Sequence, residues 1–481
     1  MTVTERQARE YEPVIGVETH VQLKTRTKMF CGCALSFGDD PNTHTCPVCL
    51  GHPGTLPVAN AEAVHFALMI AMAFECEIAP RSIFHRKNYF YPDLPKGYQI
   101  SQYDIPLARN GHLGDVRIHR VHLEEDAAKL VHAGASGRIH GAETSVVDFN
   151  RGGTPLVEIV TEPDLRSAAE AAEFGRLLQA TLRRMGVSDV NMEEGSLRID
   201  ANVSIRPAGE AVLGTKTELK NMNSFRFLER GIAAEIARQE AVLREGGEIE
   251  QETLHFDPQT NSLSPLRTKE YAHDYRYFPE PDLVPIAPTE AMLERARAAL
   301  PELPAARAAR LERELELPAD TARLLSFRFE LGDFFEQAVA AGDGDARSLA
   351  NWVTNELPAR IGDADPADTK VEPVALARLV AMVGAKEVSR SAAQEVLDVL
   401  VADGGDPAAV VESKGLGRAD TSELEDIVER AIAENGDAVE KIRAGKVQAV
   451  GAIVGAVMRE TKGRADGGEV QRMIRERLGI S

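Results

Sequence analysis

The stretch from His122 to Lys129 reads HLEEDAAK and places a histidine and three consecutive acidic residues in a segment that otherwise alternates like a β-strand. Glu125 is in phase with Val121 and Leu123, on the face expected to point toward protein. Burying an ionised carboxylate costs several kcal/mol unless a cation or hydrogen-bond donors meet it. Any sheet that contains this strand must therefore supply a partner for its acids.

Two other predicted strands carry similar polar residues. Residues 14–23 (VIGVETHVQL) alternate so that Glu18 and His20 share one face, and Glu158 stands alone in the apolar segment 152–160. Oxygen ligands with at most one imidazole suit Mg²⁺ or Mn²⁺ better than zinc or copper. The three strands together predict a divalent metal site. The alternative for each acid taken alone is a salt bridge to a nearby Arg or Lys.

Four cysteines predict a second metal site. Cys31, Cys33, Cys46 and Cys49 form the pattern C-x-C-x12-C-x2-C, in which two close pairs can hold one tetrahedral zinc ion. Such zinc would be structural, because four thiolates leave no open position for a substrate. The alternative is two disulfides, which a reducing compartment disfavours.

Composition limits the compartment and the partners. The longest apolar run, residues 63–78, is too short to cross a bilayer, and the first residues lack the apolar core of a signal peptide, so we expect a cytoplasmic protein with no membrane contact. The net charge of −20 argues against indiscriminate nucleic-acid binding, so any such contact must be local. Neither a P-loop nor a dinucleotide fingerprint is present, so a nucleotide would depend on the metal and on loop residues.

The segment 86–104 (RKNYFYPDLPKGYQISQYD) is rich in aromatic and basic residues and is predicted to be an ordered binding loop. Its rings can stack on bases, and its cations can bind phosphate or carboxylate groups. The alternative is aromatic packing beneath a long loop. The candidates for binding ATP or substrate in this segment are Arg86, Asn88, Tyr89 and Lys96.

A helix from Ser167 to about Gly186 is followed by a strand over residues 196–207 with one apolar and one polar face. A further strand and a helix from about Phe225 to Gly246 come next. The polar faces predict the floor of a binding cradle, although a solvated face is the alternative. The candidates on this floor are Arg198, Asp200, Arg206 and Lys220.

Beyond residue 292 the pattern is helical, which predicts a helical domain over 293–405 and a small helical module over 406–481. Between residues 441 and 477 there are nine basic residues against four acidic ones, which reverses the charge of the chain as a whole. We expect Lys446, Arg459 and Lys462 to face solvent or phosphate. The fold class that follows is α+β, with a mixed-sheet cradle over 1–292.

Several motifs, in order, resemble the B subunit family of the aspartyl/glutamyl-tRNA amidotransferases, and the resemblance runs nearly end to end. They are VIGVETHVQL, FGDDPNTHTCPVCLGHPGTLPV, RKNYFYPDLPKGYQISQYD, HLEEDAAK, DFNRGGTPLVEIVTEPD, MEEGSLRIDANVSIRP, LKNMNSF and DYRYFPEPDL. The tail sequence GKVQAVGAIVGAVMRETKGRA resembles the YqeY-like module of that family.

This resemblance implies an ATP-dependent ligase. ATP would phosphorylate the side-chain carboxylate of Glu on tRNA(Gln) or of Asp on tRNA(Asn), and ammonia would then displace the phosphate. An amidase A subunit would release the ammonia from glutamine, and a small C subunit would complete a heterotrimer. The resemblance assigns the Mg²⁺ (or Mn²⁺) to His20, Glu125 and Glu158, with Glu18 close by, and makes Lys87 a catalytic candidate.

Two other functions compete with this one. A non-catalytic scaffold that presents tRNA would need basic and aromatic residues but would have no use for inward-pointing carboxylates. A metal-dependent hydrolase would leave the YqeY-like tail unexplained. The sequence leaves open whether Glu-tRNA(Gln), Asp-tRNA(Asn) or both are substrates.

Overall fold

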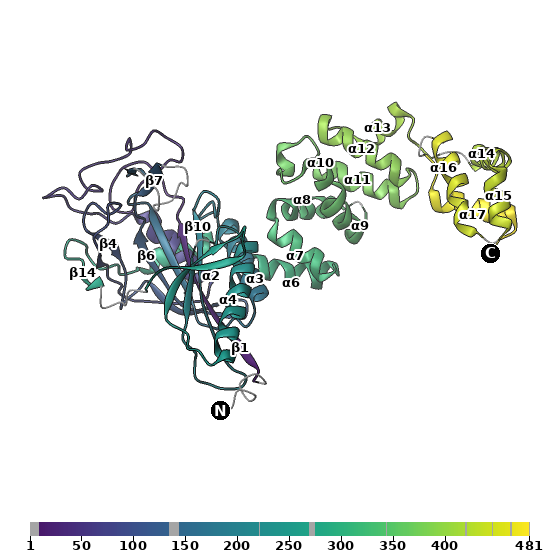
Figure 1. Cartoon of the computed structure of the whole chain (residues 1–481). Coiled ribbons are helices and arrows are strands. Elements are labelled where there is room, and N and C mark those ends of the chain that lie inside the picture. Colours follow the sequence, from purple (N-terminus) through teal and green to yellow (C-terminus); the bar gives the residue numbers. More distant parts are fainter. Residues whose placement is uncertain are drawn as a thin grey trace. The chain divides into compact units, whose positions relative to one another are not determined.

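The computed structural model describes residues 9–133, 144–220, 222–268, 275–342, 344–418, 421–444, 446–461 and 464–480. The chain divides into two compact units, residues 1–303 and residues 304–481. Figure 1 shows a first unit built around a large sheet and a second unit that is entirely helical. The predicted α+β class, with a mixed sheet followed by helices, is confirmed.

A nine-stranded mixed sheet forms the centre of the first unit, and β1 lies near its middle. Adjacent strands of this sheet are antiparallel, except that β11 and β12 are parallel. In spatial order the strands are β13 (Ser262–Thr268), β12 (Glu252–Asp257), β11 (Thr217–Lys220), β10 (Leu197–Pro207), β1 (Tyr11–Gln22), β9 (Pro155–Thr161), β6 (Val116–Glu125), β5 (Ala108–Leu113) and β2 (Glu77–Ile78).

One face of this sheet is apolar and is covered by helices. Val17, Val157 and Ile199 are among the strand residues that join one core with residues of the helices. Alternation along the strands then directs the side chains between these residues to the opposite face. The helices are α2 (Ala61–Ala73), α3 (Ala168–Met185), α4 (Phe225–Glu245) and α5 (Glu290–Ala299).

The two helices predicted within this unit are confirmed, and local capping sets their ends. The Ser167 side chain accepts a hydrogen bond from the Glu170 amide at the start of α3. Gly186 ends that helix with a φ of 70°, and Gly246 ends α4 with a φ of 87°. Both values lie in the left-handed region that glycine adopts without steric cost.

The segment predicted as a loop, residues 86–104, contains two strands instead. β3 (His85–Asn88) pairs with β4 (Tyr98–Ser101) and with β14 (Phe278–Pro279) in a separate three-stranded sheet. The expected ordered binding loop is thus confined to the residues between β3 and β4, because the aromatic and charged residues at its two ends form a short antiparallel pair. A third sheet joins β7 (Lys129–Ala133) to β8 (Thr144–Asp148).

The helix α5, which spans the predicted boundary at residue 292, belongs to the first unit. Ala296 of α5 is fully buried in the core of the large sheet, and Arg295 forms an ion pair with Glu62 of α2 at 2.8 Å. The division between the units therefore falls at Pro304, later than the predicted boundary, because α5 buries its apolar side against α2.

Two separate hydrophobic cores make up the second unit. The larger core takes in Val411 and Leu416, so α13 (Pro407–Lys414) packs with the helical domain although the sequence placed it in the tail. The elements of this core are α6 (Pro304–Leu315), α7 (Ala319–Phe327), α8 (Phe329–Ala340), α9 (Ala346–Asn351), the π-helix Trp352–Glu356, α10 (Pro358–Ile361), the 3-10 helix Pro366–Asp368, α11 (Pro373–Gly384), α12 (Arg390–Asp403) and α13.

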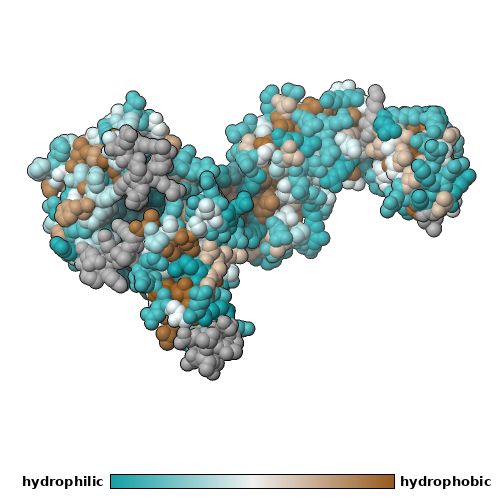
Figure 2. All heavy atoms as spheres, viewed as in Figure 1, coloured by the Kyte–Doolittle hydropathy of each residue, from teal (hydrophilic) through white to brown (hydrophobic). Residues whose placement is uncertain are grey.

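The smaller core begins at Leu424 and belongs to the tail module. Its elements are α14 (Thr421–Glu434), α15 (Gly436–Arg443), the 3-10 helix Val447–Ala449, α16 (Val450–Glu460) and α17 (Gly467–Leu478). Within the described residues, no helix combines the length and the apolar character needed to cross a bilayer. Figure 2 shows hydrophilic residues over most of the face in view, with hydrophobic residues in small patches.

Candidate active site

Polar residues line up across four strands on the face of the large sheet opposite the core. His122 of β6 is in register with Glu158 of β9, which is in register with His20 of β1, and His20 is in register with Arg198 of β10. Because cross-strand partners lie side by side, residues separated by more than 130 positions in the chain meet in one row. Glu18 is two residues before His20 on the same face.

The side chains of this row form an acidic group that we call the acidic centre, made of Glu18, His20, His122, Glu124 and Glu158. His20 Nε2 lies 3.6 Å from a Glu158 oxygen and 3.7 Å from an oxygen of each of Glu18 and Glu124. His122 Nε2 lies 3.3 Å from Glu158. Possible metal ligands fall into two sets that share Glu158: Glu18, His20 and Glu158, and then His122, Glu124 and Glu158.

Glu125 is not part of this centre, which corrects the expected ligand set. Its side chain is buried, but one oxygen accepts a hydrogen bond from the Ile100 amide at 2.9 Å and the ammonium group of Lys96 binds the same oxygen. The preceding residue, Glu124, is the one that faces His20. Alternation with Val121 and Leu123 selected Glu125. These two residues face the core, whereas the polar row lies on the other face of the strand.

The electrostatics of the acidic centre fit a bound cation. Repulsion from Glu158, and then burial, raise the pKa of Glu18 above its ordinary value. Burial would lower the pKa of His20, but the close carboxylates of Glu158, Glu124 and Glu18 outweigh burial and raise that pKa to about 9. His122 is 2% exposed, and its Nδ1 atom has no hydrogen-bond partner within the described residues. A divalent cation would relieve the repulsion among these carboxylates.

Two basic residues border the acidic centre. Arg120 donates from Nη2 to the second oxygen of Glu158 at 3.1 Å, which fixes the orientation of that carboxylate. Burial would lower the pKa of Lys87, but the neighbouring Tyr277, Glu124 and Glu158 outweigh it and raise the pKa. Lys87 therefore keeps its positive charge at neutral pH.

A cavity of about 410 Å³ opens beside the acidic centre. It brings together residues of the large sheet, residues of the small sheet and the segment before α4. Its lining includes six of the residues predicted from the sequence: His20, Lys87, Tyr89, Arg198, Asp200 and Lys220. It also includes Gln99, Glu124, Asp126, Ala127, Leu156, Ile199, Met222 and Asn223.

Aromatic residues surround Lys87 on the small-sheet side of this cavity. The Lys87 ammonium lies 4.8 Å from the centre of the Tyr275 ring, a cation–π distance. Tyr89 and Tyr277 each contact the Tyr275 ring edge to face, with ring centres 6.1 Å apart. Tyr277 in turn stacks on Tyr103 at 4.3 Å. Tyr275 and Tyr277 come from the motif DYRYFPEPDL, whose first residue, Asp274, lies outside the described residues.

Two predicted binding residues instead hold the small sheet in place. Arg86 donates from Nε to Glu280 at 2.7 Å, and its guanidinium lies 4.3 Å from the centre of the Tyr98 ring. Asn88 donates to the carbonyl of Arg276 at 2.8 Å. Neither residue lines the large cavity. Both interactions connect β3 to the segment that contains β14.

Lys96 and Arg206 also lie away from the large cavity. Lys96 binds Glu125 and lines a separate cavity of about 80 Å³ beside the cysteines. Arg206, near the end of β10, donates to Glu12 of β1 at 2.6 Å. Sequence alternation placed Arg206 on the correct face of its strand but could not show how far along the strand the cavity extends.

Arg198 lines the cavity together with a fully paired acid, Asp126. Asp126 accepts hydrogen bonds from Gln22 at 2.7 Å and from Arg198 at 3.0 Å, and Arg151 lies 3.7 Å away. Burial would raise the pKa of Asp126, but Arg198 and Arg151 outweigh burial and hold the pKa below its ordinary value. This network fixes the guanidinium group of Arg198 at the cavity wall.

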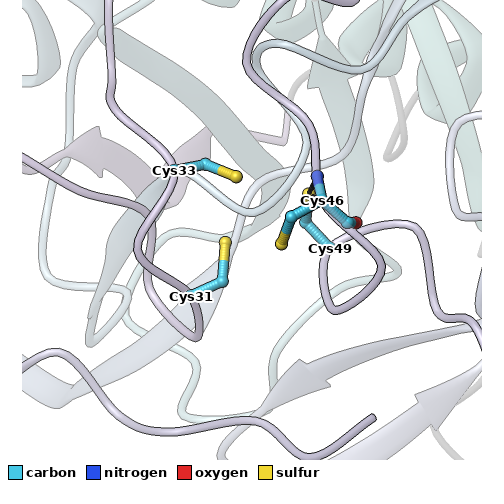
Figure 3. Close-up of side chains that lie close together, drawn as sticks. All are labelled: Cys31, Cys33, Cys46 and Cys49. Carbon is cyan, nitrogen blue, oxygen red and sulfur yellow. Dashed lines mark hydrogen bonds between the residues drawn. The ribbon is translucent and has the colours of Figure 1, made fainter.

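The four predicted zinc ligands come together (Figure 3). Two loops direct the sulfur atoms of Cys31, Cys33, Cys46 and Cys49 toward one another, all within 4.8 Å, and none of the four forms a disulfide. A hydrogen bond with the Cys31 thiol, with help from Lys28, lowers the pKa of the Cys49 thiol to about 4. Four thiol groups with a stabilised thiolate suit a structural zinc ion.

The predicted tail residues are partly described. Lys446 and Arg459 are exposed, and no acidic side chain of the described residues pairs with either of them, whereas Arg464 and Arg477 form ion pairs with glutamates of α14. Lys462 lies outside the described residues. Much of the positive charge of the tail is therefore compensated within the module, and Lys446 and Arg459 remain available to a ligand.

The sequence did not reveal several residues of the site: Arg120, His122, Glu124, Asp126, Tyr275 and Tyr277. His122 and Glu124 alternate with the buried Val121 and Leu123, so they lie on the face of β6 opposite the core, which is also the face that carries His20. This alternation could have selected them from the sequence. Tyr275 and Tyr277 belong to the aromatic motif DYRYFPEPDL, but their position next to Lys87 depends on the pairing of β14 with β3.

Comparison with known proteins adds two family matches. The family described as "GatB/GatE catalytic domain" matches residues 13–294, which include the whole acidic centre and the four cysteines. The family described as "GatB domain" matches residues 333–478, which include most of the helical unit.

Curated relatives match over nearly their full lengths. The chain is 51% identical to the B subunit of the aspartyl/glutamyl-tRNA(Asn/Gln) amidotransferase of Frankia casuarinae, over 98% of this chain and 96% of that protein. It is 49% identical to the protein of the same name from Thermobifida fusca, over 98% of this chain and 95% of that protein. The protein of the same name from Carboxydothermus hydrogenoformans is 47% identical, over 98% of this chain and 99% of that protein.

Proposed function

Because the chain belongs to the family of aspartyl/glutamyl-tRNA(Asn/Gln) amidotransferase B subunits, we propose that it activates and amidates misacylated tRNA. The side-chain carboxylate of Glu on tRNA(Gln), or of Asp on tRNA(Asn), attacks the γ-phosphorus of ATP, and ADP leaves. Ammonia then attacks the acyl phosphate, loses a proton and displaces inorganic phosphate, which gives the amide.

The observation that carries this proposal is the acidic centre beside a cavity that also contains Lys87. Glu18, His20, His122, Glu124 and Glu158 are the residues that would hold Mg²⁺ or Mn²⁺. When bound, the ion would neutralise phosphate charge and orient phosphate oxygens. The three glutamates of this set lie near His20 on one face of the sheet, whereas Glu125 binds Lys96.

The chain's own cations have defined roles in this proposal. Lys87, which stays protonated beside Glu124 and Glu158, binds phosphate oxygens of ATP at the cavity wall. Arg198, fixed by Asp126, offers a second cation from the opposite wall. Arg120 holds the orientation of Glu158. Phosphoryl transfer depends mainly on such positioning and charge neutralisation.

We also propose the assembly and the metal content. Ammonia comes from glutamine that an amidase A subunit hydrolyses, a small C subunit completes the heterotrimer, and the tail binds tRNA through Lys446, Arg459 and Lys462. A zinc ion on the four cysteines stabilises the loops next to the sheet. The close grouping of the thiols and the exposure of Lys446 and Arg459 support these assignments.

The test is an assay of the chain with its A and C subunits on Glu-tRNA(Gln) and on Asp-tRNA(Asn), following ADP and glutamate release. We expect ADP formation that requires the misacylated tRNA. Glu158→Gln should abolish it, while glutamine hydrolysis by the partner remains chemically possible. Glu162→Gln is the matched control, because Glu162 pairs with His119 near the end of the same strand, outside the cavity.

This assay also separates an enzyme from a scaffold. A tRNA-presenting scaffold would leave ADP formation unchanged in Glu158→Gln, since the phosphorylation would occur in a partner. Absence of ADP formation on either misacylated tRNA in the assembled complex would refute the proposal.

A further inference from the structure

The large cavity has a second end, away from the acidic centre, where one carboxylate is still available. The acids that line the cavity are Glu124, Asp126 and Asp200. Glu124 belongs to the acidic centre, and Asp126 is bound by Gln22, Arg198 and Arg151. Among the described residues that line the cavity, Asp200 is therefore the acid outside the acidic centre whose carboxylate can still accept a hydrogen bond from a ligand.

Asp200 has one oxygen paired and one oxygen open. Its Oδ2 atom accepts a hydrogen bond from Lys220 Nζ at 2.8 Å, and within the described residues its other oxygen accepts none. Its side chain is 13% exposed, so a ligand in the cavity can reach it while bulk water is largely excluded. An additional hydrogen bond to this carboxylate would be strong, because burial lowers the local dielectric.

The charge around Asp200 favours a cation. Lys220 is shared between Asp200 and Glu218, whose nearer oxygen lies 3.4 Å from Nζ. Glu18, in register with Asp200 on the neighbouring strand, adds a third carboxylate. Glu18 also lies 3.7 Å from His20, so the charge that favours an ammonium ligand is that of Asp200 itself, whose open oxygen lies beside these carboxylates.

The spacing between Asp200 and the acidic centre can be compared with the dimensions of an aminoacyl ester. Residues in register on neighbouring antiparallel strands have Cβ atoms about 4.5–5.5 Å apart, so Asp200 lies one strand away from Glu18 of the acidic centre. In an aspartyl or glutamyl ester the α-nitrogen and the side-chain carboxyl carbon are roughly 3–5 Å apart, from ordinary bond lengths. A carboxylate placed at the acidic centre would thus put the α-ammonium group within reach of Asp200.

We propose that Asp200, held by Lys220, binds the α-ammonium group of the aminoacyl ester and makes the site selective for aminoacyl-tRNA with a free α-amino group. The inference rests on the proposed function, because that function places the side-chain carboxylate beside the acidic centre. Asp200 is then a specificity-determining residue that touches the substrate on the side remote from the phosphoryl group.

The experiment compares Glu-tRNA(Gln) with N-acetyl-Glu-tRNA(Gln) in the complete three-subunit complex, measuring kcat/KM for ADP formation. The wild-type complex should prefer the free amine by about 100-fold, because the acetylated nitrogen carries no charge to pair with a desolvated carboxylate. Asp200→Asn should reduce this preference to within about threefold by lowering kcat/KM for the free amine alone, and Asp200→Glu should restore part of it. The KM for ATP should change by less than about threefold in these variants.

Glu12→Gln is the matched control, because Glu12 forms a cross-strand ion pair with Arg206 on the same two strands but outside the cavity. It should retain the preference for the free amine. Equal use of the two tRNAs by the wild-type complex overturns the inference even if Asp200→Asn does not fold. An Asp200→Asn complex that keeps the preference but needs more ATP overturns it as well, since Asp200 would then serve the nucleotide. Failure of the proposed function is a separate result, in which neither tRNA supports ADP formation.

Discussion

At the scale of single residues, two adjacent glutamates show how one strand divides its roles. Glu124 points to the sheet face that carries His20, and Glu125 points to the Ile100 amide and Lys96. The alternation of a strand makes this separation unavoidable, because successive side chains leave on opposite faces. The same residue type in consecutive positions is therefore a candidate metal ligand on one face and a structural ion-pair partner on the other.

This division predicts different effects on metal binding. Glu124→Gln should weaken binding of Mn²⁺ by at least about 100-fold, because it removes a charged ligand from the acidic centre. Glu125→Gln should leave the Mn²⁺ affinity within about threefold but lower the stability, because it leaves the Lys96 ammonium without its carboxylate. Calorimetric titration of Mn²⁺ into the two variants measures the difference. Equal losses of affinity in both would contradict the assignment.

Asp126 makes the stability of the first unit depend on pH in a defined direction. Its pKa is lower in the folded protein than in the unfolded chain, so its contribution is present above the unfolded pKa of about 3.9 and is lost as the pH falls through the folded value. Asp126→Asn should reduce the free energy of unfolding by about 2 kcal/mol at pH 7, since Arg198 and Gln22 lose a charged partner. The deficit should shrink below about pH 4.

Urea denaturation of both proteins at pH 7, pH 5 and pH 3 tests this expectation. A deficit that stays constant down to pH 3 would show that the ionisation of Asp126 does not contribute to stability.

At the scale of elements, short pieces of chain with little regular structure bring residues to the site. The cysteine loops show only single bridges such as Thr27 with Ala34, and the small sheet has strands of two and four residues. Such elements bury little apolar surface, so we expect polar interactions and bound metal to supply their order. Arg86 with Glu280 and Asn88 with Arg276 are interactions of this kind.

The cysteine loops should therefore depend on zinc. The purified protein should contain about one equivalent of zinc, and Cys46→Ser should lose it and lower the thermal midpoint by at least about 3 °C. Cys76→Ser is the control for zinc content, because Cys76 lies outside the group of four. Elemental analysis and thermal denaturation give both readouts. A folded, fully reduced protein without zinc would refute the assignment.

At the scale of the whole molecule, three hydrophobic cores define parts with separate tasks. The first core supports the sheet whose other face carries the acidic centre. The second core extends through Leu416, and the third begins at Leu424. A truncation that removes the tail without exposing the second core must therefore cut between these two residues, rather than at residue 406, the predicted start of the tail module.

Deleting residues 419–481 should raise the KM for tRNA by about tenfold and leave kcat at saturating tRNA within about twofold. If the tail contacts tRNA as proposed and takes no part in the phosphoryl transfer, its removal weakens binding of the substrate and of the transition state equally. Replacing Lys446, Arg459 and Lys462 with Ala should flatten the salt dependence by roughly 0.9 log unit of slope for each duplex phosphate that is no longer neutralised. Arg472→Ala is the control, because Arg472 pairs with Glu476 on its own helix. An unchanged KM and slope would make the tail a solvated module without a role in tRNA binding.

The sequence by itself indicated the long strands and the helices, because alternation, helical periodicity and capping residues are local signals, but it missed the short strands β3 and β4. It placed His20, Glu18 and Glu158 together correctly, since each is a polar residue between apolar neighbours in a predicted strand. It also determined the cysteine group, whose close pairs limit the geometry strongly.

Only the tertiary structure decided which residues share the cavity. The face of β6 that meets the cavity carries Glu124 and not Glu125, and the cavity includes Asp200 but leaves out Arg206. The pairing of β14 with β3 brought Tyr275 and Tyr277 to Lys87 from nearly 190 residues away. Register and the pairing of distant strands are set by how whole faces pack, and a local pattern of residues carries no information about a partner that far along the chain.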